Sequence, residues 1–240
     1  MARGEAMTGI VYGVGVGPGD PELVTVKAAR LIAAADLIAY PAPEEGESFA
    51  RRIAAPHMRP GQREVAIRMK IGDGQFPKDD VYDAAAARLA AAARRGETVV
   101  VLCEGDPFFY GSFMYLYARL ATRVRVEVVP GVSSLMACAV ASGGALAAKN
   151  DVLTIVPAPL PESELKRRLG EAEAAAIIKL GRHFPKVRKV LDELGLTRHA
   201  RYVEHATLDS QKVIRLDEFD GATAPYFSML LVHRRGEAWS

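Results

Sequence analysis

The sequence predicts an α/β protein of two domains, and three observations support this. Short apolar runs alternate with helical patterns from residue 10 to residue 194, as in sheets whose strands are joined by helices. Three strand ends pass into helix starts through turns rich in Gly and Pro. After residue 200 strands follow one another with little room for helices, which predicts an antiparallel meander. We place the boundary near residue 124, with domains over residues 1–124 and 125–240.

The first half shows clear strand and helix periodicities. Residues 10–16 indicate a buried strand, and apolar residues recur every three to four positions over 23–33, as on one face of a helix. A second strand over 37–40 is expected to stop at Pro41 and Pro43. The alanine-rich segment 82–95 favours a helix. Further strands are expected over 65–69, 98–103 and 124–129.

The second half continues this alternation and then loses its helices. An alanine-rich helix is expected to start at Ser133 or Ser134, either of which can cap it, and to run to about Ser142. Two more helices are expected over 161–169 and 185–194. Strands are expected over 152–156, 174–180, 200–204, 212–216 and 227–232.

The turns at the strand ends are the candidate ligand-binding segments. A Gly-Asp-Pro triplet occurs at residues 19–21 and again at 105–107, and a Pro-Gly turn occurs at 130–131. Ligands of α/β proteins bind at the carboxyl ends of strands. A single such turn is more often only structural, whereas three of them favour a binding site.

Phosphate is not the ligand that these turns predict. The glycines at 13, 15, 17 and 19 fit neither the dinucleotide fingerprint nor a P-loop. Asp20 and Asp106 would place carboxylates where a phosphate would bind at a helix start. A neutral or cationic ligand is therefore favoured.

Composition excludes several classes of protein. The net charge of +2 does not favour a nucleic-acid partner. Cys103 and Cys138 lack the spacing of metal ligands, so we expect no metal site and two inert thiols. No apolar run is long enough for a membrane helix, and the N-terminus lacks the pattern of a signal peptide. A cytoplasmic location is expected.

Five segments carry a resemblance to a known family. They are YGVGVGPGDPEL (12–23), CEGDPFFYGS (103–112), VVPGVSS (128–134), KLGRHF (179–184) and PYFS (225–228). In these segments the chain resembles the tetrapyrrole methylase family, the S-adenosylmethionine-dependent enzymes of corrin and sirohaem synthesis. The resemblance implies two α/β domains, each a mixed sheet flanked by helices, with the cofactor in the cleft between them. It also implies a homodimer.

The resemblance assigns roles to individual residues. It implies a cofactor site formed by Pro18, Glu104, Gly105, Asp106, Phe109, Ser133, Ser134, Leu180, Ala206 and Phe227. The tetrapyrrole side is assigned to Tyr12, Gly15, Gly17, Arg182 and His183. No residue is a certain catalytic group; Glu104, Asp106 and Tyr110 are candidates for positioning, and with His183 they are the titratable groups near strand ends. Many relatives carry Thr and Arg where this chain has residues 147–149, Ala-Ala-Lys, which puts one polar contact in doubt.

The implied reaction is methyl transfer from S-adenosylmethionine to C20 of precorrin-2, giving precorrin-3A in cobalamin biosynthesis. The cobalt-loaded substrate of the anaerobic route is an alternative. A methylase acting on RNA or protein, and a non-catalytic nucleotide- or tetrapyrrole-binding protein, are further alternatives. The basic residues Lys179, Arg182, His183, Lys186 and Arg188 either bind the acidic groups of the substrate or form a solvated helix face.

Overall fold

The protein consists of two compact units. A computed structural model describes residues 9–69 and 79–234. Contacts between Cα atoms divide the chain into Met1–Ser133 and Ser134–Ser240. This division falls later than the boundary we expected near residue 124, because the strand over Arg125–Val129 pairs with the first strand of the chain.

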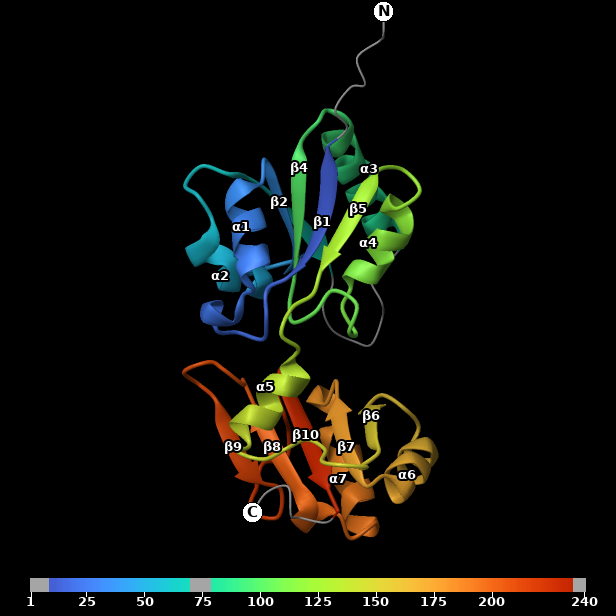
Figure 1. Ribbon diagram of the computed structural model, residues 1–240. Helices are drawn as coiled ribbons and strands as arrows, with labels where there is room; N and C mark the ends of the chain where they lie inside the picture. The colour runs from blue at the N-terminus through green and yellow to red at the C-terminus, as the bar shows by residue number, and fades with distance from the viewer. Residues whose placement is uncertain (1–8, 70–78, 235–240) are drawn as a thin grey trace, which may run out of the picture. The chain divides into compact units, whose positions relative to one another are not determined.

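The first unit is a five-stranded sheet with helices on both faces (Figure 1). Its strands are β1 (Ile10–Gly15), β2 (Leu37–Pro43), β3 (Arg63–Met69), β4 (Thr98–Cys103) and β5 (Arg125–Val129), in the order β3-β2-β4-β1-β5. All of their pairings are parallel, although we expected a mixed sheet; the bridge between Gly17 and Gly105, beyond the strand ends, is antiparallel. Parallel strands explain the continuous apolar runs, because both faces are covered.

Two hydrophobic cores hold the layers of the first unit together. One core lies between the sheet and the helices α3 (Asp79–Arg94) and α4 (Phe113–Leu120). The other lies on the opposite face, against α1 (Val26–Ala34) and α2 (Phe49–Ala54). Two short 3-10 turns, η1 (Pro21–Leu23) and η2 (Ala55–His57), complete the α1 and α2 side.

Two expectations for this unit were wrong in detail. The second strand does not stop at Pro41 but continues to Pro43, because beyond Ala39 it pairs only with β3 and leaves its other edge free of ladder hydrogen bonds. The helix that follows the second Gly-Asp-Pro triplet begins at Phe113. Residues 104–112 are therefore a loop, and Asp106 does not cap a helix.

The second unit is a mixed five-stranded sheet. Its strands are β6 (Leu153–Pro157), β7 (Ala174–Ile178), β8 (Ala200–Glu204), β9 (Lys212–Arg215) and β10 (Ser228–His233), in the order β6-β7-β10-β8-β9. The pairing of β6 with β7 is parallel, and the other pairings are antiparallel, as the sequence predicted for the end of the chain.

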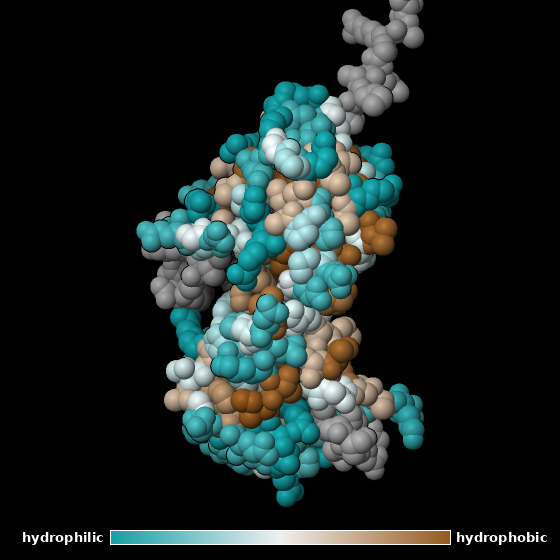
Figure 2. Space-filling view, turned by 90° about the vertical axis from the view of Figure 1, so that its left-hand side faces the viewer, coloured by the Kyte–Doolittle hydropathy of each residue, from teal (hydrophilic) through white to brown (hydrophobic). Residues whose placement is uncertain are grey.

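Helices again cover the second sheet. The core on one face is formed with α6 (Glu162–Glu171) and α7 (Phe184–Glu193), while α5 (Ser134–Ala141) contacts β10. Two more 3-10 turns, η3 (Gly181–His183) and η4 (Thr197–His199), flank α7. The surface in Figure 2 is mainly hydrophilic, with hydrophobic colour in small patches. Among the described residues, no helix is long and apolar enough to span a bilayer.

Candidate functional site

The carboxyl ends of β1 and β4 form the switch point of the first sheet. After β1 the chain crosses the sheet on the α1 face to reach β2, whereas after β4 it crosses on the α4 face to reach β5 (Figure 1). Ligands of open parallel sheets bind where the connections of neighbouring strands diverge in this way. Two of the predicted ligand-binding turns, those with the Gly-Asp-Pro triplets at 19–21 and 105–107, follow these strand ends.

Three glycines allow the strand ends to pack backbone against backbone at the switch point. A Cβ atom added to Gly15 would lie 2.6 Å from the Gly105 carbonyl oxygen and 2.6 Å from the Gly131 Cα. A Cβ on Gly131 would lie 2.1 Å from the same carbonyl oxygen. The space beside Gly15 is thus filled by the protein's own backbone. Gly15, which we assigned to the substrate side, is therefore first of all a packing residue of the strand ends.

Gly17 and Gly105 extend the pairing of β1 and β4 beyond the strands. Each donates its amide to the carbonyl oxygen of the other, at 3.3 Å and 2.8 Å. Both adopt a left-handed backbone, with φ of 81° and 62°, which glycine tolerates without a steric penalty. The predicted cofactor residue Pro18 follows Gly17 and is half-buried.

Asp106 binds three backbone amides. Its Oδ1 accepts hydrogen bonds from Phe108 at 2.9 Å and Phe109 at 3.1 Å, and its Oδ2 accepts one from Gly131 at 3.0 Å. We expected this carboxylate to face a cationic part of the ligand. In the structure this carboxylate shapes the 104–112 loop and ties the loop to the end of β5. Sequence analysis missed the part played by Gly131, for which the Pro-Gly turn was the available signal.

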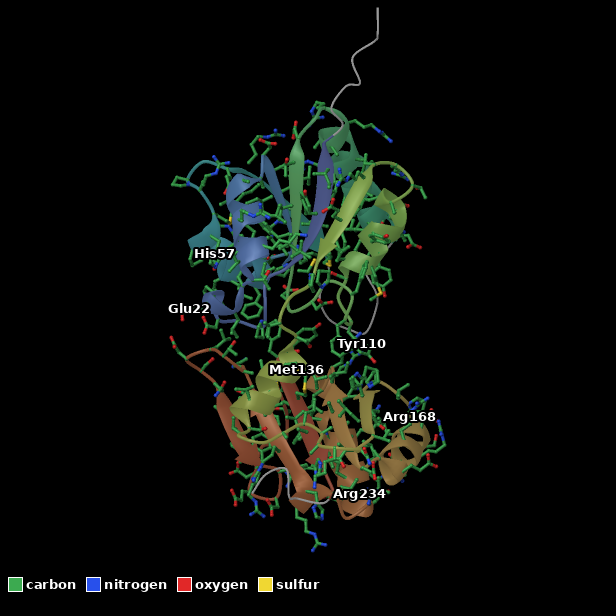
Figure 3. The ribbon with its side chains drawn as sticks, viewed as in Figure 1. Glu22, His57, Tyr110, Met136, Arg168 and Arg234 are labelled. Carbon is green, nitrogen blue, oxygen red and sulfur yellow. The ribbon has the colours of Figure 1, made fainter. Side chains whose placement is uncertain are left out.

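Asp20 also binds a backbone amide at the first turn, but its effect is local. Its Oδ1 accepts the Glu22 amide at 2.8 Å and so caps the 3-10 turn η1. The ring Nε2 of His57 lies 3.0 Å from the Pro21 carbonyl oxygen and holds this turn from the other side. Glu22 and His57 are both labelled on the α1 and α2 side in Figure 3.

Glu104 and Tyr110 stand at the two ends of the 104–112 loop. Burial raises the pKa of Glu104 above its ordinary value of 4.5, while hydrogen bonds from its own amide and that of Ala50 act against this shift. Tyr110 is 44% exposed, has a φ of 55° and stacks edge-on against Phe109. Figure 3 shows Tyr110 beyond the carboxyl ends of the strands. A left-handed non-glycine residue costs free energy and is typical of functional loops.

In the second unit, the predicted residues Leu180, Ala206 and Phe227 gather at one edge of the sheet. Leu180 follows the end of β7, Ala206 follows the end of β8, and Phe227 precedes β10. The register of β10 with both neighbours brings these ends side by side, and the His205 amide donates to the Phe227 carbonyl oxygen at 2.9 Å. Leu180 and Ala206 are buried, whereas Phe227 is 40% exposed. The edge therefore exposes the aromatic ring of Phe227 beside two buried apolar residues.

A polar network supports this edge. Tyr202 donates to Glu204 at 2.6 Å, and the Lys212 ammonium lies 3.3 Å from the same carboxylate. Burial acts to raise the pKa of Glu204, but these two hydrogen bonds outweigh it, and the pKa is lowered. Lys179, His205 and Thr207 all have positive φ values close to this edge. The network fixes the backbone where three strand ends meet.

The predicted basic residues do not act as one group. The Lys186 ammonium donates to the Leu160 carbonyl oxygen at 2.6 Å, and Arg188 donates to that of Phe219. These two side chains therefore hold α7 in place. Arg182 is exposed and His183 is half-buried on η3. Burial, Lys186 and Arg182 lower the pKa of His183, so this ring is mainly neutral at neutral pH.

The remaining predicted residues lie apart from these two surfaces or at the point in the chain where one unit ends and the next begins. Tyr12 is in the middle of β1 and packs against the α1 and α2 core, not at the strand end. Ser133 ends the first unit and Ser134 begins α5. Both cysteines are free and buried, and burial raises the pKa of each thiol, that of Cys138 to about 12. Within residues 9–69 and 79–234, no cluster of three His, Cys, Asp or Glu side chains is placed to hold a metal ion.

Comparison with known proteins identifies the family. The family described as Tetrapyrrole (Corrin/Porphyrin) Methylases matches residues 10–220. The chain belongs to the tetrapyrrole methylase family. Its similarity to one curated member, a precorrin-2 C(20)-methyltransferase of a Sinorhizobium species, is 40% identity over 93% of this chain and 95% of that protein. A cobalt-precorrin-2 C(20)-methyltransferase of Salmonella typhimurium is 29% identical over 96% and 99% of the two chains.

One group of relatives is longer than this chain. The cobalamin biosynthesis protein CobIJ of Mycobacterium tuberculosis is 43% identical over 93% of this chain but only 46% of its own length. The chain thus spans about half of the CobIJ proteins that it matches.

Solved structures of tetrapyrrole methylases share the fold. The cobalt precorrin-4 methyltransferase CbiF superposes with a TM-score of 0.75 at 25% identity, over 97% of both chains. A uroporphyrin-III C-methyltransferase of Thermus thermophilus, in complex with S-adenosylhomocysteine, gives a TM-score of 0.71 at 27% identity, over 93% of this chain and 97% of that one. The expected α/β fold is therefore confirmed.

Proposed function

We propose that this protein transfers the methyl group of S-adenosylmethionine to C20 of precorrin-2, in the biosynthesis of cobalamin. The observation that carries this proposal is the 40% identity, over 95% of its length, with a precorrin-2 C(20)-methyltransferase. The relatives of known structure include one that holds S-adenosylhomocysteine. The substrate is a small molecule, so neither a nucleic acid nor a membrane partner is required.

The residues present fit the chemistry of the cofactor. S-adenosylmethionine combines a flat apolar purine with a charged amino acid. The exposed Phe227 ring, beside the buried Leu180 and Ala206, suits the purine, and the 104–112 loop, with Pro18 and Ser133, offers backbone polar groups to the amino-acid part. We propose these residues, with Ser134, as the cofactor site, and the cleft between the domains stays our prediction for its place.

The chain's own contribution is chiefly to position the reactants. When bound, S-adenosylmethionine supplies an activated methyl group. Asp106 and the glycines of the switch point hold the loop in one conformation through hydrogen bonds and backbone packing. Correct placement of reactants can be worth effective molarities of about 10⁵–10⁸ M. We assign Gly17, Arg182 and His183 to the substrate side, with Arg182 the cation for an acidic group, whereas Tyr12 and Gly15 of the expected set serve the packing of β1.

A direct assay tests the proposal. The purified protein is incubated with S-adenosylmethionine and either metal-free or cobalt-loaded precorrin-2, and the products are analysed by mass spectrometry. We expect the metal-free substrate to gain one methyl group at C20. A strong preference for the cobalt-loaded form would support the second candidate, which the similarity to the Salmonella enzyme favours.

Binding and turnover experiments separate the proposed function from a non-catalytic binding protein and from a methylase that acts on another substrate. Calorimetry with S-adenosylhomocysteine should show binding in the micromolar range, and its absence would contradict every methylase proposal. Binding without turnover of either precorrin-2 form would contradict the proposed substrate alone. The net charge of +2 speaks against RNA as the methyl acceptor.

Two further proposals concern the state of the enzyme in the cell. We propose a homodimer, which light scattering of the purified protein tests; a monomer at micromolar concentration would contradict it. We propose a cytoplasmic location, where free thiols such as those of Cys103 and Cys138 stay reduced. Cell fractionation tests this location.

A further inference from the structure

Methylation at C20 requires a group that removes a proton, and this requirement rests on the function proposed above. The C20 carbon of the substrate bears a hydrogen, so the methylated product regains its conjugation only when that hydrogen leaves as a proton. A base close to the reacting carbon speeds such a step by about 10²–10⁴-fold. The question is which side chain of this protein can serve.

Three candidate groups lie at or near the switch point, and they differ in their hydrogen bonds and in their exposure. The Asp106 carboxylate is committed to three backbone amides and shapes the loop. Tyr110 is a phenol on the exposed part of the loop. Glu104 is half-buried, and among the described residues it takes part in no ion pair. Of the three groups, Glu104 therefore has a carboxylate that is not already neutralised or fully bonded.

Glu104 lies at the ligand-binding end of the sheet and is partly shielded from bulk water. It directly follows β4 and lies at the switch point. Alternation along the strand points it to the same face as Val100 and Leu102, toward α1 and α2. Extension of the strand registers places it between Val16 and Ala42, which are buried apolar residues.

We propose that Glu104 is the base that accepts the proton from C20. With the methyl group supplied by the sulfonium, a π-electron pair of the macrocycle forms the new C–C bond and the C–S pair remains on sulfur. The C20–H bond then breaks, its electron pair returns to the conjugated system, and the proton passes to a Glu104 carboxylate oxygen. Release of this proton to water restores the carboxylate.

The electrostatics of the site agree with this role. Burial raises the pKa of Glu104 above 4.5, and a stronger base accepts a proton from carbon more readily. The titratable and charged groups on the neighbouring elements are Tyr12 on β1, Tyr40 on β2, the exposed Lys27 and Arg30 on α1, Arg51 and Arg52 on α2, and Cys103 and Asp106 on its own segment. Arg51 is bound to Glu64 at 2.9 Å, and Arg52 lies 5.0 Å from the centre of the Phe49 ring, so both cations are engaged elsewhere.

The test uses Glu104→Gln, with Glu127→Gln as the control. Glu127 is a carboxylate on β5 that pairs with Arg125, and its replacement should leave turnover within about twofold of wild type. Glutamine keeps the shape of Glu104 and can still accept the Ala50 amide, but it is a far weaker base. We expect E104Q to lower kcat by about 10²-fold or more, with the affinity for S-adenosylhomocysteine within about twofold.

Three further readouts distinguish a base from a structural residue. Substrate deuterated at C20 should show a larger isotope effect in E104Q than in wild type, because proton removal becomes slow. The acidic limb of the kcat/KM profile, where Glu104 becomes protonated, should be absent from E104Q. Since burial raises the folded-state pKa, ionised Glu104 destabilises the fold at neutral pH, and E104Q should melt at a higher temperature than wild type. This gain should vanish below the pKa of the unfolded chain.

The possible failures are distinct. If wild type turns over but E104Q retains more than about a third of its kcat, Glu104 is not the base. If E104Q instead loses cofactor affinity and melting temperature together, its role is structural and the proposal is wrong. If wild type methylates neither form of precorrin-2, the proposed function fails, and the role of Glu104 fails with it.

Discussion

The Asp106 carboxylate accepts a hydrogen bond from the Gly131 amide at 3.0 Å, across 25 residues of sequence. This bond joins the loop after β4 to the end of β5, while the other carboxylate oxygen binds two amides of the loop itself. One side chain therefore sets both the shape and the position of the segment that we assign to the cofactor.

Asp106→Asn should weaken both the fold and cofactor binding. An amide has one acceptor oxygen, so either the Gly131 amide or the two loop amides lose their partner. Loss of a hydrogen bond to a charged group costs about 1.5–3 kcal/mol. Urea unfolding should show this loss, and calorimetry should show weaker binding of S-adenosylhomocysteine. Asp20→Asn is the control, because the hydrogen bond that its carboxylate accepts from the Glu22 amide lies within a single turn. An equal loss in both variants would contradict our account.

Gly131→Ala should destabilise the first unit through a steric clash. The new Cβ would lie 2.1 Å from the Gly105 carbonyl oxygen and 2.8 Å from the Gly15 Cα, and backbone atoms cannot move aside at low cost. Overpacking of this kind costs about 1–3 kcal/mol. Gly170→Ala on α6 is the matched control, because the nearest atom to its Cβ is a Leu194 methyl at 4.0 Å. Thermal unfolding should show a lower melting temperature for G131A and an equal or higher one for G170A.

Phe227→Ala should weaken binding of S-adenosylhomocysteine by about tenfold or more, because stacking of a base on an aromatic ring contributes about 1–3 kcal/mol. Phe227 is 40% exposed at the sheet edge, so its loss should leave the melting temperature nearly unchanged. Tyr117→Ala is the control, since Tyr117 is an aromatic residue of similar exposure on α4. Calorimetry that finds equal affinities for wild type and F227A would remove this edge from the cofactor site.

The two thiols should be unreactive in the native protein at pH 8. Burial raises the pKa of Cys138 to about 12, so only about 10⁻⁴ of it is thiolate, the reactive form. Burial and the nearby Glu104 charge raise the pKa of Cys103 well above its usual range. A thiol reagent should therefore label neither residue until the protein is unfolded in urea. Fast labelling of either thiol in the folded protein would show that its site opens.

The position of the predicted strands could be read from the sequence because their patterns are local. Continuous β-branched runs such as that of β4 predict strands covered on both faces, and the meander after residue 200 follows from the lack of room for helices. Pro41 and Pro43 gave a wrong prediction for the end of β2, which continues to Pro43. Proline interrupts a strand only where a ladder partner needs its amide, and pairing on that side already ends at Ala39.

The sequence by itself determined the fold class, the family resemblance and the segments at the strand ends, since these depend on residue type and spacing along the chain. Tertiary structure alone decided what those residues do. The same Gly-Asp-Pro triplet gives a local cap at Asp20 and a link between two strands at Asp106, because only the second carboxylate has the end of β5 within hydrogen-bonding distance. The packing of Gly15 against Gly131 and the burial that raises the pKa of Glu104 likewise arise from strands distant in sequence. Such contacts leave no pattern in a single sequence.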